Sequence, residues 1–266
     1  MDIRYVNDGG IVTITIDREE RRNALAPQTM VDLRDALLRF DEDPSALVAI
    51  VTGAGPDAFC AGADIKETLP ADRSFIEGYF DREVGSTHPL YIRNIALPKL
   101  GIRKPVIAAV NGVAVGGGTE IALNCDLCIA SENARFGLTE VRIGSIPAVA
   151  GIQRLLRSLP RAAAMQLLLT GSIVDAKWAL QWGLVSEVVA TQDLLPRARE
   201  IAQCISENAP LAVRSAKLLA DKAAELSLRE ATDVEELLWG HLYATEDRVE
   251  GRKAFAEKRK PTYRAK

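Results

Sequence analysis

A run of three glycines, Gly116–Gly118, is the first feature of this sequence that points to chemistry. It follows an apolar run typical of a buried strand, Val106–Val110, and precedes a helix-compatible stretch that begins near Thr119. Free backbone N–H groups collect at such a helix start, where the helix dipole is positive. The glycine spacing fits neither a phosphate loop nor a dinucleotide-binding loop, because Gly118 and Ile121 occupy positions that need lysine and glycine. We interpret the run as a turn where backbone approaches a ligand, with tight packing as the alternative.

Two glutamates lie close to this turn in the sequence. Glu120 belongs to the first turn of the expected helix, and Glu140 follows Phe136–Thr139. Each has an ordinary explanation when taken alone, because Glu120 would complement the helix dipole and Glu140 would be a solvated loop residue. Together they could serve as an acid/base pair, since repulsion between two carboxylates raises the pKa of one of them.

A second turn of small residues, Ala61-Gly62-Ala63, follows another strand-like segment. Without bulky side chains, the backbone N–H groups of this turn can face a ligand. Asp64 and Glu67 have the spacing of a helix capping box, and we assign them that structural function.

The remaining reactive residue types give weaker signals. Cys125 and Cys128 form a CxxC motif, but His88 and His241 are distant in sequence and no second CxxC completes a zinc set. We therefore expect buried structural thiols and no metal site. The motifs GxSxG and HExxH are absent, so any catalysis should come from carboxylates and backbone amides.

The elements that must position these groups follow an α/β pattern. Strands are expected at Ile11–Ile16, at Val106–Val110 and at Leu127–Ala130, and a helix should begin at Pro27. The continuous apolar run Leu47–Val51 predicts a strand that is buried on both faces. Strand, helix and strand in this order indicate a parallel βα unit.

The composition of the chain changes after about residue 189. Between Leu194 and Lys260 there are only two glycines, and Leu, Ala, Glu, Lys and Arg dominate, which predicts three or four consecutive helices. We divide the 266 residues into a catalytic core at 1–193 and a helical C-terminal region at 194–266.

The overall composition excludes several classes of protein. The net charge of −3 disfavours a nucleic-acid binder that works through bulk charge, and no apolar run is long enough to cross a bilayer. Four cysteines make no disulfide framework, and the first residues lack the features of a secretory signal. We expect a soluble, cytoplasmic protein.

A series of motifs, in a fixed order along the chain, matches the pattern of a known protein family. The motifs are Arg22–Leu25, Phe59–Glu67, Lys104–Gly112, Gly116–Glu120, Asn124–Asp126, Phe136–Glu140, Gln153–Leu155, Trp182–Val185 and Glu250–Pro261. Over nearly its whole length the sequence resembles the crotonase superfamily of enoyl-CoA hydratases and isomerases. This resemblance implies a crotonase-like spiral of ββα units, followed by a helical oligomerisation region that packs homotrimers or homohexamers.

The resemblance also implies a reaction. The substrate would be an acyl-CoA thioester, so that coenzyme A arrives with the substrate and no cofactor is permanently bound. The N–H groups of Ala63 and Gly117 would form an oxyanion hole. Glu120 matches the residue that orients and deprotonates water, and Glu140 matches the residue that exchanges a proton with the α-carbon. Both acids are present, which favours an enoyl-CoA hydratase of fatty-acid metabolism.

Further residues match positions that bind the substrate in the family. They are Ala24, Ala61, Asp64, Ile65, Lys66, Ala148, Phe255 and Lys258. The N–H of Ala148 would bind the catalytic water. Phe255 and Lys258, three residues apart on one helical face, would contact the adenine and phosphates of coenzyme A bound to a neighbouring subunit.

Some residues depart from the family pattern and leave alternatives open. The segment 148–151 has fewer glycines than usual, Thr139 replaces a frequent proline, and the segment 68–101 is long and carries Phe75, Tyr79, Phe80 and Tyr91. The acyl group cannot be read from it, and isomerase, dehydratase or hydratase-lyase activity stays open.

A different class within the family binds AU-rich RNA. The stretch Gln28–Asp43, where such members carry lysines, has two arginines against five acids and would repel phosphate. We expect neither a nucleic-acid partner nor a membrane.

Overall fold

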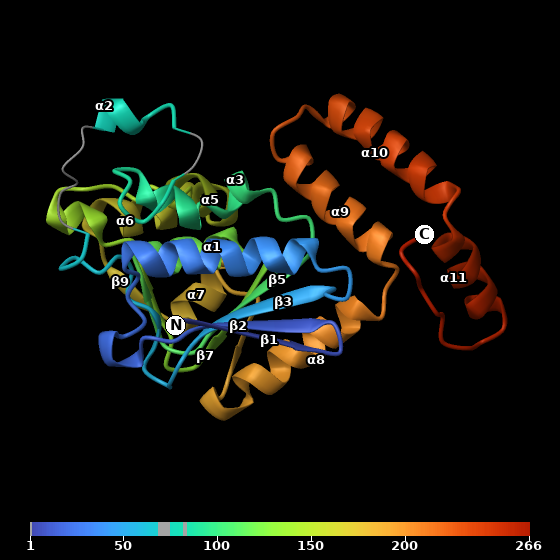
Figure 1. Ribbon diagram of the computed structural model, residues 1–266, viewed down its shortest axis with the longest axis horizontal. Coiled ribbons are helices and arrows are strands. Elements are labelled where there is room, and N and C mark those ends of the chain that lie inside the picture. The colour runs from blue at the N-terminus through green and yellow to red at the C-terminus, as the bar shows by residue number, and fades with distance from the viewer. Residues whose placement is uncertain (1, 69–74, 82–83) are drawn as a thin grey trace.

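The computed structural model describes residues 2–68, 75–81 and 84–266 of a mixed α/β fold with two sheets (Figure 1). The larger sheet has six strands in the order β1 (Ile3–Asp8), β2 (Ile11–Ile16), β3 (Val48–Gly53), β5 (Val106–Val110), β7 (Leu127–Ser131) and β10 (Glu187–Val189). The smaller sheet has the order β4 (Ala58–Cys60), β6 (Val113–Val115), β8 (Arg135–Gly137) and β9 (Ile173–Asp175).

The two sheets are built by successive pairs of strands. In the pairs β3–β4, β5–β6 and β7–β8, the first strand joins the larger sheet and the second joins the smaller one. Neighbouring pairs run parallel in both sheets, so each helical return places the next pair beside the last. This arrangement is the predicted spiral of ββα units, and the parallel pairing of β2 with β3 confirms the predicted βα unit.

Strand β3 is buried along its whole length, as its apolar sequence predicts. Val48 and Ile50 point to one face of the sheet, where they pack against helix α8 (Leu194–Ser206), and Ala49 and Val51 belong to the main core on the other face. The side chains of a strand alternate between faces, so only a continuous apolar run can bury both.

Helix α1 (Pro27–Glu42) covers the main core above the larger sheet (Figure 1). Pro27 occupies its first turn, where a missing N–H costs nothing, and Met30, Leu33, Leu37 and Phe40 are buried at helical spacing. The short helices that follow in the chain are α2 (Phe75–Gly78), η2 (Tyr91–Ile95), α3 (Leu97–Leu100), α4 (Gly117–Asn124), η3 (Glu140–Ile143), α5 (Gly151–Ser158), α6 (Arg161–Thr170) and α7 (Ala176–Trp182). Two further 3₁₀ helices are η1 (Glu19–Arg21) and η4 (Thr191–Asp193).

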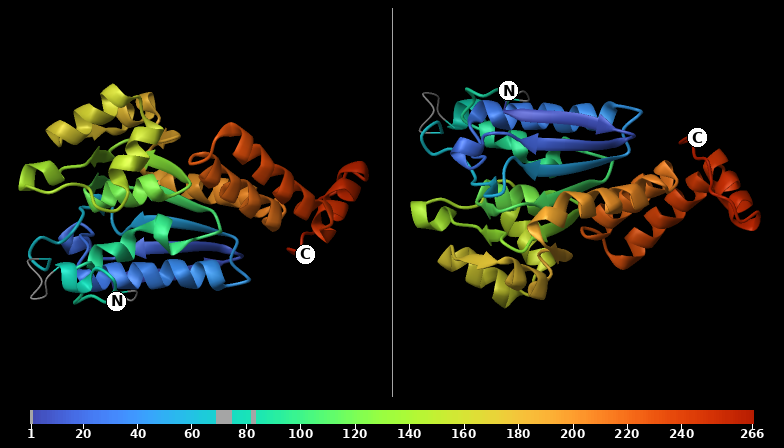
Figure 2. Two further views of the ribbon diagram at one scale, coloured as in Figure 1. Left: turned by 90° about the horizontal axis from the view of Figure 1, so that it is seen from above. Right: turned by 90° about the horizontal axis from the view of Figure 1, so that it is seen from below.

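The C-terminal residues form four helices, as predicted. After α8 come α9 (Pro210–Ala223), α10 (Leu228–Tyr243) and α11 (Glu246–Ala256). Lys217 ties α9 to Asp126, between α4 and β7, with an N–O distance of 2.7 Å, whereas α10 and α11 project beyond the sheets (Figures 1 and 2). Because α8 packs on the larger sheet and Lys217 ties α9 to Asp126, the projecting part consists of α10 and α11; the division at 193/194 stays a prediction. No helix in the described ranges is both long and apolar enough to span a membrane.

Candidate active site

The two turns of small residues meet in the structure. A Cβ built on Gly62 would lie 2.8 Å from the carbonyl oxygen of Val115 and 3.4 Å from the nitrogen of Gly117. A Cβ on Gly118 would overlap the carbonyl oxygen of Cys60. The turn after β4 and the start of α4 therefore interlock through backbone contacts that only glycine permits.

Ala63 is held beside Leu25 by an isolated parallel bridge. The N–H of Leu25 donates to the carbonyl of Gly62 at 2.8 Å, and the N–H of Asp64 donates to the carbonyl of Leu25 at 3.0 Å. In this geometry the N–H of Ala63 faces away from Leu25. Gly117 is the first residue of α4, so its N–H has no acceptor within the helix.

Neither of these two N–H groups donates a hydrogen bond to another group in the described part of the chain. Two adjacent, unused backbone donors at a helix N-terminus are suited to an oxygen that develops negative charge. Ile95, at the end of η2, covers the same turn, because its Cδ1 would lie 3.4 Å from a Cβ on Gly117.

Glu120 is 1% exposed and points from α4 toward the start of α5. Its Oε1 accepts hydrogen bonds from the N–H groups of Val149 at 2.8 Å and Gly151 at 2.9 Å. Burial raises the pKa of Glu120 to about 7. The hydrogen bonds from the two N–H groups favour the charged form and lower the pKa, but burial has the larger effect. The carboxyl group can therefore exchange a proton near neutral pH, as a general acid or base requires.

Glu140, the first residue of η3, is half-buried beside the glycine turn. Its Oε1 would lie 3.2 Å from a Cβ on Gly116, and its Oε2 has no hydrogen-bond partner in the described part of the chain. Burial raises the pKa of Glu140, and its negative charge also raises the pKa of Glu120. Both carboxyl groups therefore lie around the same turn, as the acid/base interpretation requires.

Asn124 supports this arrangement and was not singled out in the sequence as a site residue. Its Nδ2 donates to the carbonyl of Glu120 at 2.8 Å and to that of Val149 at 2.7 Å, and its Oδ1 accepts from Nε of Arg154 at 3.3 Å. The spacing of Glu120 and Asn124, four apart on a short helix, is the signal that could have revealed the pair.

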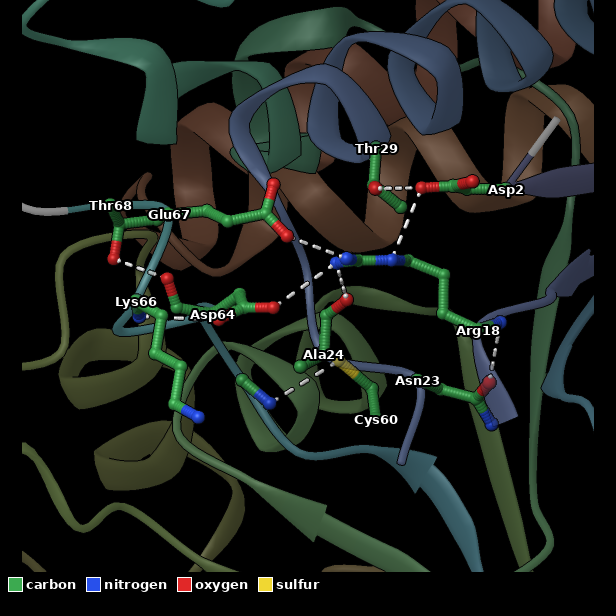
Figure 3. A network of polar contacts seen from close by, with 11 residues as sticks. Asp2, Arg18, Asn23, Ala24, Thr29, Cys60, Asp64, Lys66, Glu67 and Thr68 are labelled. Atoms are coloured by element: carbon green, nitrogen blue, oxygen red, sulfur yellow. Dashed lines mark hydrogen bonds and ion pairs between the residues drawn. The ribbon is translucent and has the colours of Figure 1, made fainter. Parts of the chain in front are cut away.

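The predicted capping box of Asp64 and Glu67 is wrong. The N–H of Glu67 donates to the main-chain carbonyl of Asp64 at 3.0 Å instead of to its side chain, and the turn does not start a described helix. The side chain of Glu67 binds Nη2 of Arg18 at 2.8 Å, and Oδ2 of Asp64 lies 3.5 Å from Nη1 (Figure 3). The guanidinium of Arg18 thus takes the side chain of Glu67, while Oδ1 of Asp64 still accepts a local hydrogen bond from the N–H of Lys66 at 3.2 Å.

The other predicted binding residues divide into two groups. Ala24 is buried and Ala61 is half-buried, while Ile65 and Lys66 are exposed in the turn after Ala63. Ala148 is exposed and precedes Val149, so it lies at the loop that holds Glu120. All five of these residues thus lie on the segments that build the site, unlike the two residues described next.

Phe255 and Lys258 lie on the projecting part of the chain, apart from these segments (Figure 1). Phe255 is 87% exposed near the end of α11. The prediction that both residues share a helical face is wrong, because α11 ends at Ala256 and Lys258 adopts a left-handed conformation with φ of 55°. The N–H of Arg259 then donates back to the carbonyl of Ala254 at 3.0 Å, which closes the helix end.

The long segment 68–101 is described in part. The side chain of Phe75 lies outside the described residues. Tyr79 and Phe80 are exposed and pack edge to face with ring centroids 5.2 Å apart, whereas Tyr91 packs against the main core. The acyl-binding role of this segment stays a prediction.

The cysteines have the environment of structural thiols. Burial raises the pKa of Cys128 to about 12 and that of Cys125 well above its usual value, and both are free. No cluster of three or more His, Cys, Asp or Glu suited to a metal ion occurs in the described ranges.

Known proteins match this chain over nearly its whole length. The family model described as Enoyl-CoA hydratase/isomerase matches residues 7–266. The chain is 43% identical over 254 residues to (E)-benzylidenesuccinyl-CoA hydratase of Thauera aromatica, covering 96% of this chain and 95% of that protein. It is 40% identical over 253 residues to short-chain-enoyl-CoA hydratase of Clostridium acetobutylicum, with 95% and 94% covered. The crystal structure of enoyl-CoA hydratase from Bacillus anthracis matches with a TM-score of 0.91 at 36% identity, covering both chains completely.

Proposed function

The chain belongs to the enoyl-CoA hydratase/isomerase family, and we propose that it adds water across the 2,3 double bond of an enoyl-CoA thioester. Its fold is that of the crotonase-type enoyl-CoA hydratases among the solved structures, and hydratases are among its relatives. The observation that carries the proposal is the placement of Glu120 and Glu140 around one glycine turn that offers unused N–H groups.

The thioester oxygen would accept hydrogen bonds from the N–H groups of Ala63 and Gly117. As water adds to C3, negative charge moves onto this oxygen and an enolate forms. Preorganised donors of this kind are worth about 3 kcal/mol each in enzymes where one has been removed. The unused state of both N–H groups supports this role.

Glu120 would orient the water and take one proton from it, while the water oxygen forms a bond to C3. Glu140 would then deliver a proton to C2, and the enolate collapses to the saturated 3-hydroxyacyl thioester. The N–H groups of Val149 and Gly151 fix the Glu120 carboxylate while lone pairs remain for water. A pKa of about 7 suits a group that must accept and later release a proton.

Coenzyme A would be bound by the segments that carry Ala24, Ala61 and Asp64–Lys66, with no cofactor held between turnovers. Phe255 and Lys258 would reach the nucleotide of a neighbouring subunit in a homotrimer or homohexamer. The projection of α10 and α11, with Leu228, Leu237 and Trp239 exposed on α10, supports such an assembly (Figure 2). We place this activity in the cytoplasm, in the metabolism of acyl-CoA thioesters.

The proposal is tested by incubating the protein with a panel of enoyl-CoA thioesters, from crotonyl-CoA to benzylidenesuccinyl-CoA. Loss of the conjugated thioester absorbance, with incorporation of one oxygen from ¹⁸O-labelled water, is the expected result. A shift of the double bond without oxygen incorporation would indicate an isomerase, and cleavage of the carbon chain would indicate a hydratase-lyase. Absence of any turnover, with salt-sensitive binding of AU-rich RNA, would replace the proposal by the RNA-binding alternative.

A further inference from the structure

The side chain of Arg18, just after β2, is 11% exposed and lies between three separate segments of the chain (Figure 3). Its Nη1 donates to the carbonyl of Ala24 at 2.7 Å, and its Nη2 binds Oε1 of Glu67 at 2.8 Å. Its Nε lies 3.2 Å from Oδ2 of Asp2, which also accepts a hydrogen bond from Thr29 at 2.7 Å. Protein acceptors thus surround the guanidinium, which leaves it unsuited to bind a phosphate of the substrate.

These contacts flank the bridge that holds Ala63. Ala24 precedes Leu25, which pairs with Ala63, and Asp64 follows Ala63. Nη1 of Arg18 contacts Ala24 on one strand of this bridge and lies 3.5 Å from the Asp64 carboxylate on the other. One planar group therefore spans both sides of the bridge, immediately behind the residue whose N–H is unused.

The loop that carries Arg18 is itself fixed. The N–H of Arg18 donates to Oδ1 of Asn23 at 3.0 Å, and Nδ2 of Asn23 donates to the carbonyls of Ala54 and Ala58 at 2.9 and 2.7 Å. Asn23 and the preceding Arg22 both adopt left-handed conformations, which turn the chain sharply toward the bridge. These hydrogen bonds tie the loop that carries Arg18 to the carbonyl of Ala54, after β3, and to that of Ala58 in β4.

We infer that Arg18 is a positioning residue of the hydration reaction, which fixes the direction of the Ala63 N–H by clamping Ala24, Asp64 and Glu67 on both sides of the Leu25–Ala63 bridge. The inference rests on the proposed function, because it assigns Arg18 to the donor that would hold the thioester oxygen. A small misplacement of such a donor costs catalysis far more than substrate binding, because the charge on the oxygen develops in the transition state.

Only arginine has the donor geometry for this task. Its guanidinium presents five N–H donors in a planar fork, whereas the ammonium of lysine is a point charge on a flexible stem. Arg18→Lys would keep the charge near Glu67 and Asp64 but could not also hold the carbonyl of Ala24. The variant separates the charge of Arg18 from its bridging geometry.

Two measurements on Arg18→Lys test the inference. We expect kcat to fall about tenfold while KM stays within about twofold. The second measurement uses acetoacetyl-CoA, a 3-ketoacyl thioester whose enolate absorbs in the near ultraviolet and shares its charge between the 3-oxygen and the thioester oxygen that Ala63 would bind. A pH titration of the bound ligand gives its pKa, which a well-placed N–H lowers, and we expect this pKa to rise in Arg18→Lys.

Arg4→Lys is the matched control, because Arg4 forms an exposed ion pair with Asp17 at 2.8 Å on the neighbouring strand β1. It should change neither kcat nor the pKa of the bound ligand. If Arg18→Lys folds poorly, Glu67→Gln provides a milder test, since it keeps Arg18 and weakens one arm of the clamp. We expect Glu67→Gln to shift the same two quantities in the same direction by about twofold.

The outcomes distinguish a failure of the proposed hydratase activity from a failure of the inference about Arg18. If the wild-type protein neither hydrates enoyl-CoA thioesters nor promotes enolate formation, the proposed function is wrong. If the wild-type protein does both and Arg18→Lys equals it, the inference about Arg18 is wrong while the function stands. A lower melting temperature with unchanged kcat and unchanged ligand pKa would assign Arg18 a purely structural role and also overturn the inference.

Discussion

The carbonyl group of Cys60 packs directly against the Cα of Gly118, with no room for a side chain between them. This contact joins the end of β4 to the start of α4 and thereby sets the distance between the two unused N–H groups. The candidate oxyanion hole is held by backbone contacts between two turns that are distant in sequence, so single side chains at these turns decide whether it can form.

Substitutions within the glycine run should differ sharply. Gly118→Ala forces a Cβ onto Cys60 and should cost about 1–3 kcal/mol of folding stability together with most of the activity. Gly117→Ala keeps the N–H, and within the described residues its Cβ would meet Ile95 at 3.4 Å and Gly62 at 3.9 Å, so the loss should be smaller. Gly117→Pro removes the donor and should abolish activity. Full turnover by Gly117→Pro, measured with crotonyl-CoA, would mean that the thioester oxygen is held elsewhere.

The two glutamates should be essential for turnover. Glu120→Gln and Glu140→Gln should each lower kcat by at least about 100-fold, because each removes one proton-transfer group while preserving shape. The double variant should be far from additive, since both acids act on one addition of water. Circular dichroism controls for folding, and near-wild-type hydration by either single variant would contradict the assigned roles.

The raised pKa of Glu120 should also appear in the stability of the fold. The carboxyl group ionises at a pKa of about 7 when folded and near 4.5 when unfolded, so folding stability is lost as pH rises through this interval. The difference is on the order of 3 kcal/mol between pH 4.5 and pH 8. Glu120→Gln should therefore gain stability relative to wild type from pH 5 to pH 8 in urea titrations, whereas the exposed variant Glu235→Gln should show no such trend.

Ala150 carries local strain that glycine should relieve. It precedes α5 in a left-handed conformation with φ of 71°, which an alanine adopts at a cost of about 1 kcal/mol. Ala150→Gly should therefore stabilise the protein slightly or leave its stability unchanged. Ala216→Gly, at an exposed position inside α9, should lose about 1 kcal/mol. Equal losses in thermal unfolding of both variants would contradict the assigned backbone strain.

Lys258 should contribute to binding of the nucleotide and not to the chemical step. Lys258→Ala should raise KM for coenzyme A thioesters several-fold with kcat nearly unchanged, and the effect should shrink at high salt. With the pantetheine thioester of the same acyl group, variant and wild type should behave alike. Lys253→Ala, at an exposed position inside α11, is the control. Equal impairment on the pantetheine substrate would mean that Lys258 acts on assembly or folding.

The sequence predicted the elements of this fold better than it predicted their contacts. The apolar run around β3 and the proline at the start of α1 are local signals, and the structure confirms both. The hold of Val149 and Gly151 on Glu120 joins residues 29 and 31 positions apart, which no local pattern reveals.

The two errors in the site have physical causes of the same kind. Asp64 and Glu67 match a capping pattern, but Glu67 binds the buried guanidinium of Arg18, 49 residues away, and Asp64 accepts from the N–H of Lys66 instead of that of Glu67. Lys258 continues the helical spacing of Phe255, but α11 ends at Ala256 and Lys258 adopts a left-handed backbone conformation. In both cases, tertiary contacts or a helix end overrode a valid local preference.

The different burial of the four cysteines should allow covalent labelling of one of them, the exposed Cys204. The thiols of Cys60 and Cys128 are buried with a pKa of about 12, and burial raises the pKa of Cys125 well above its usual value. Thiolates are the forms that react with maleimides and iodoacetamide, so these three should resist both reagents. Cys204, exposed on α8, should accept a fluorophore at a single position and report on movements of the projecting helices while Cys60, beside the candidate site, stays unmodified.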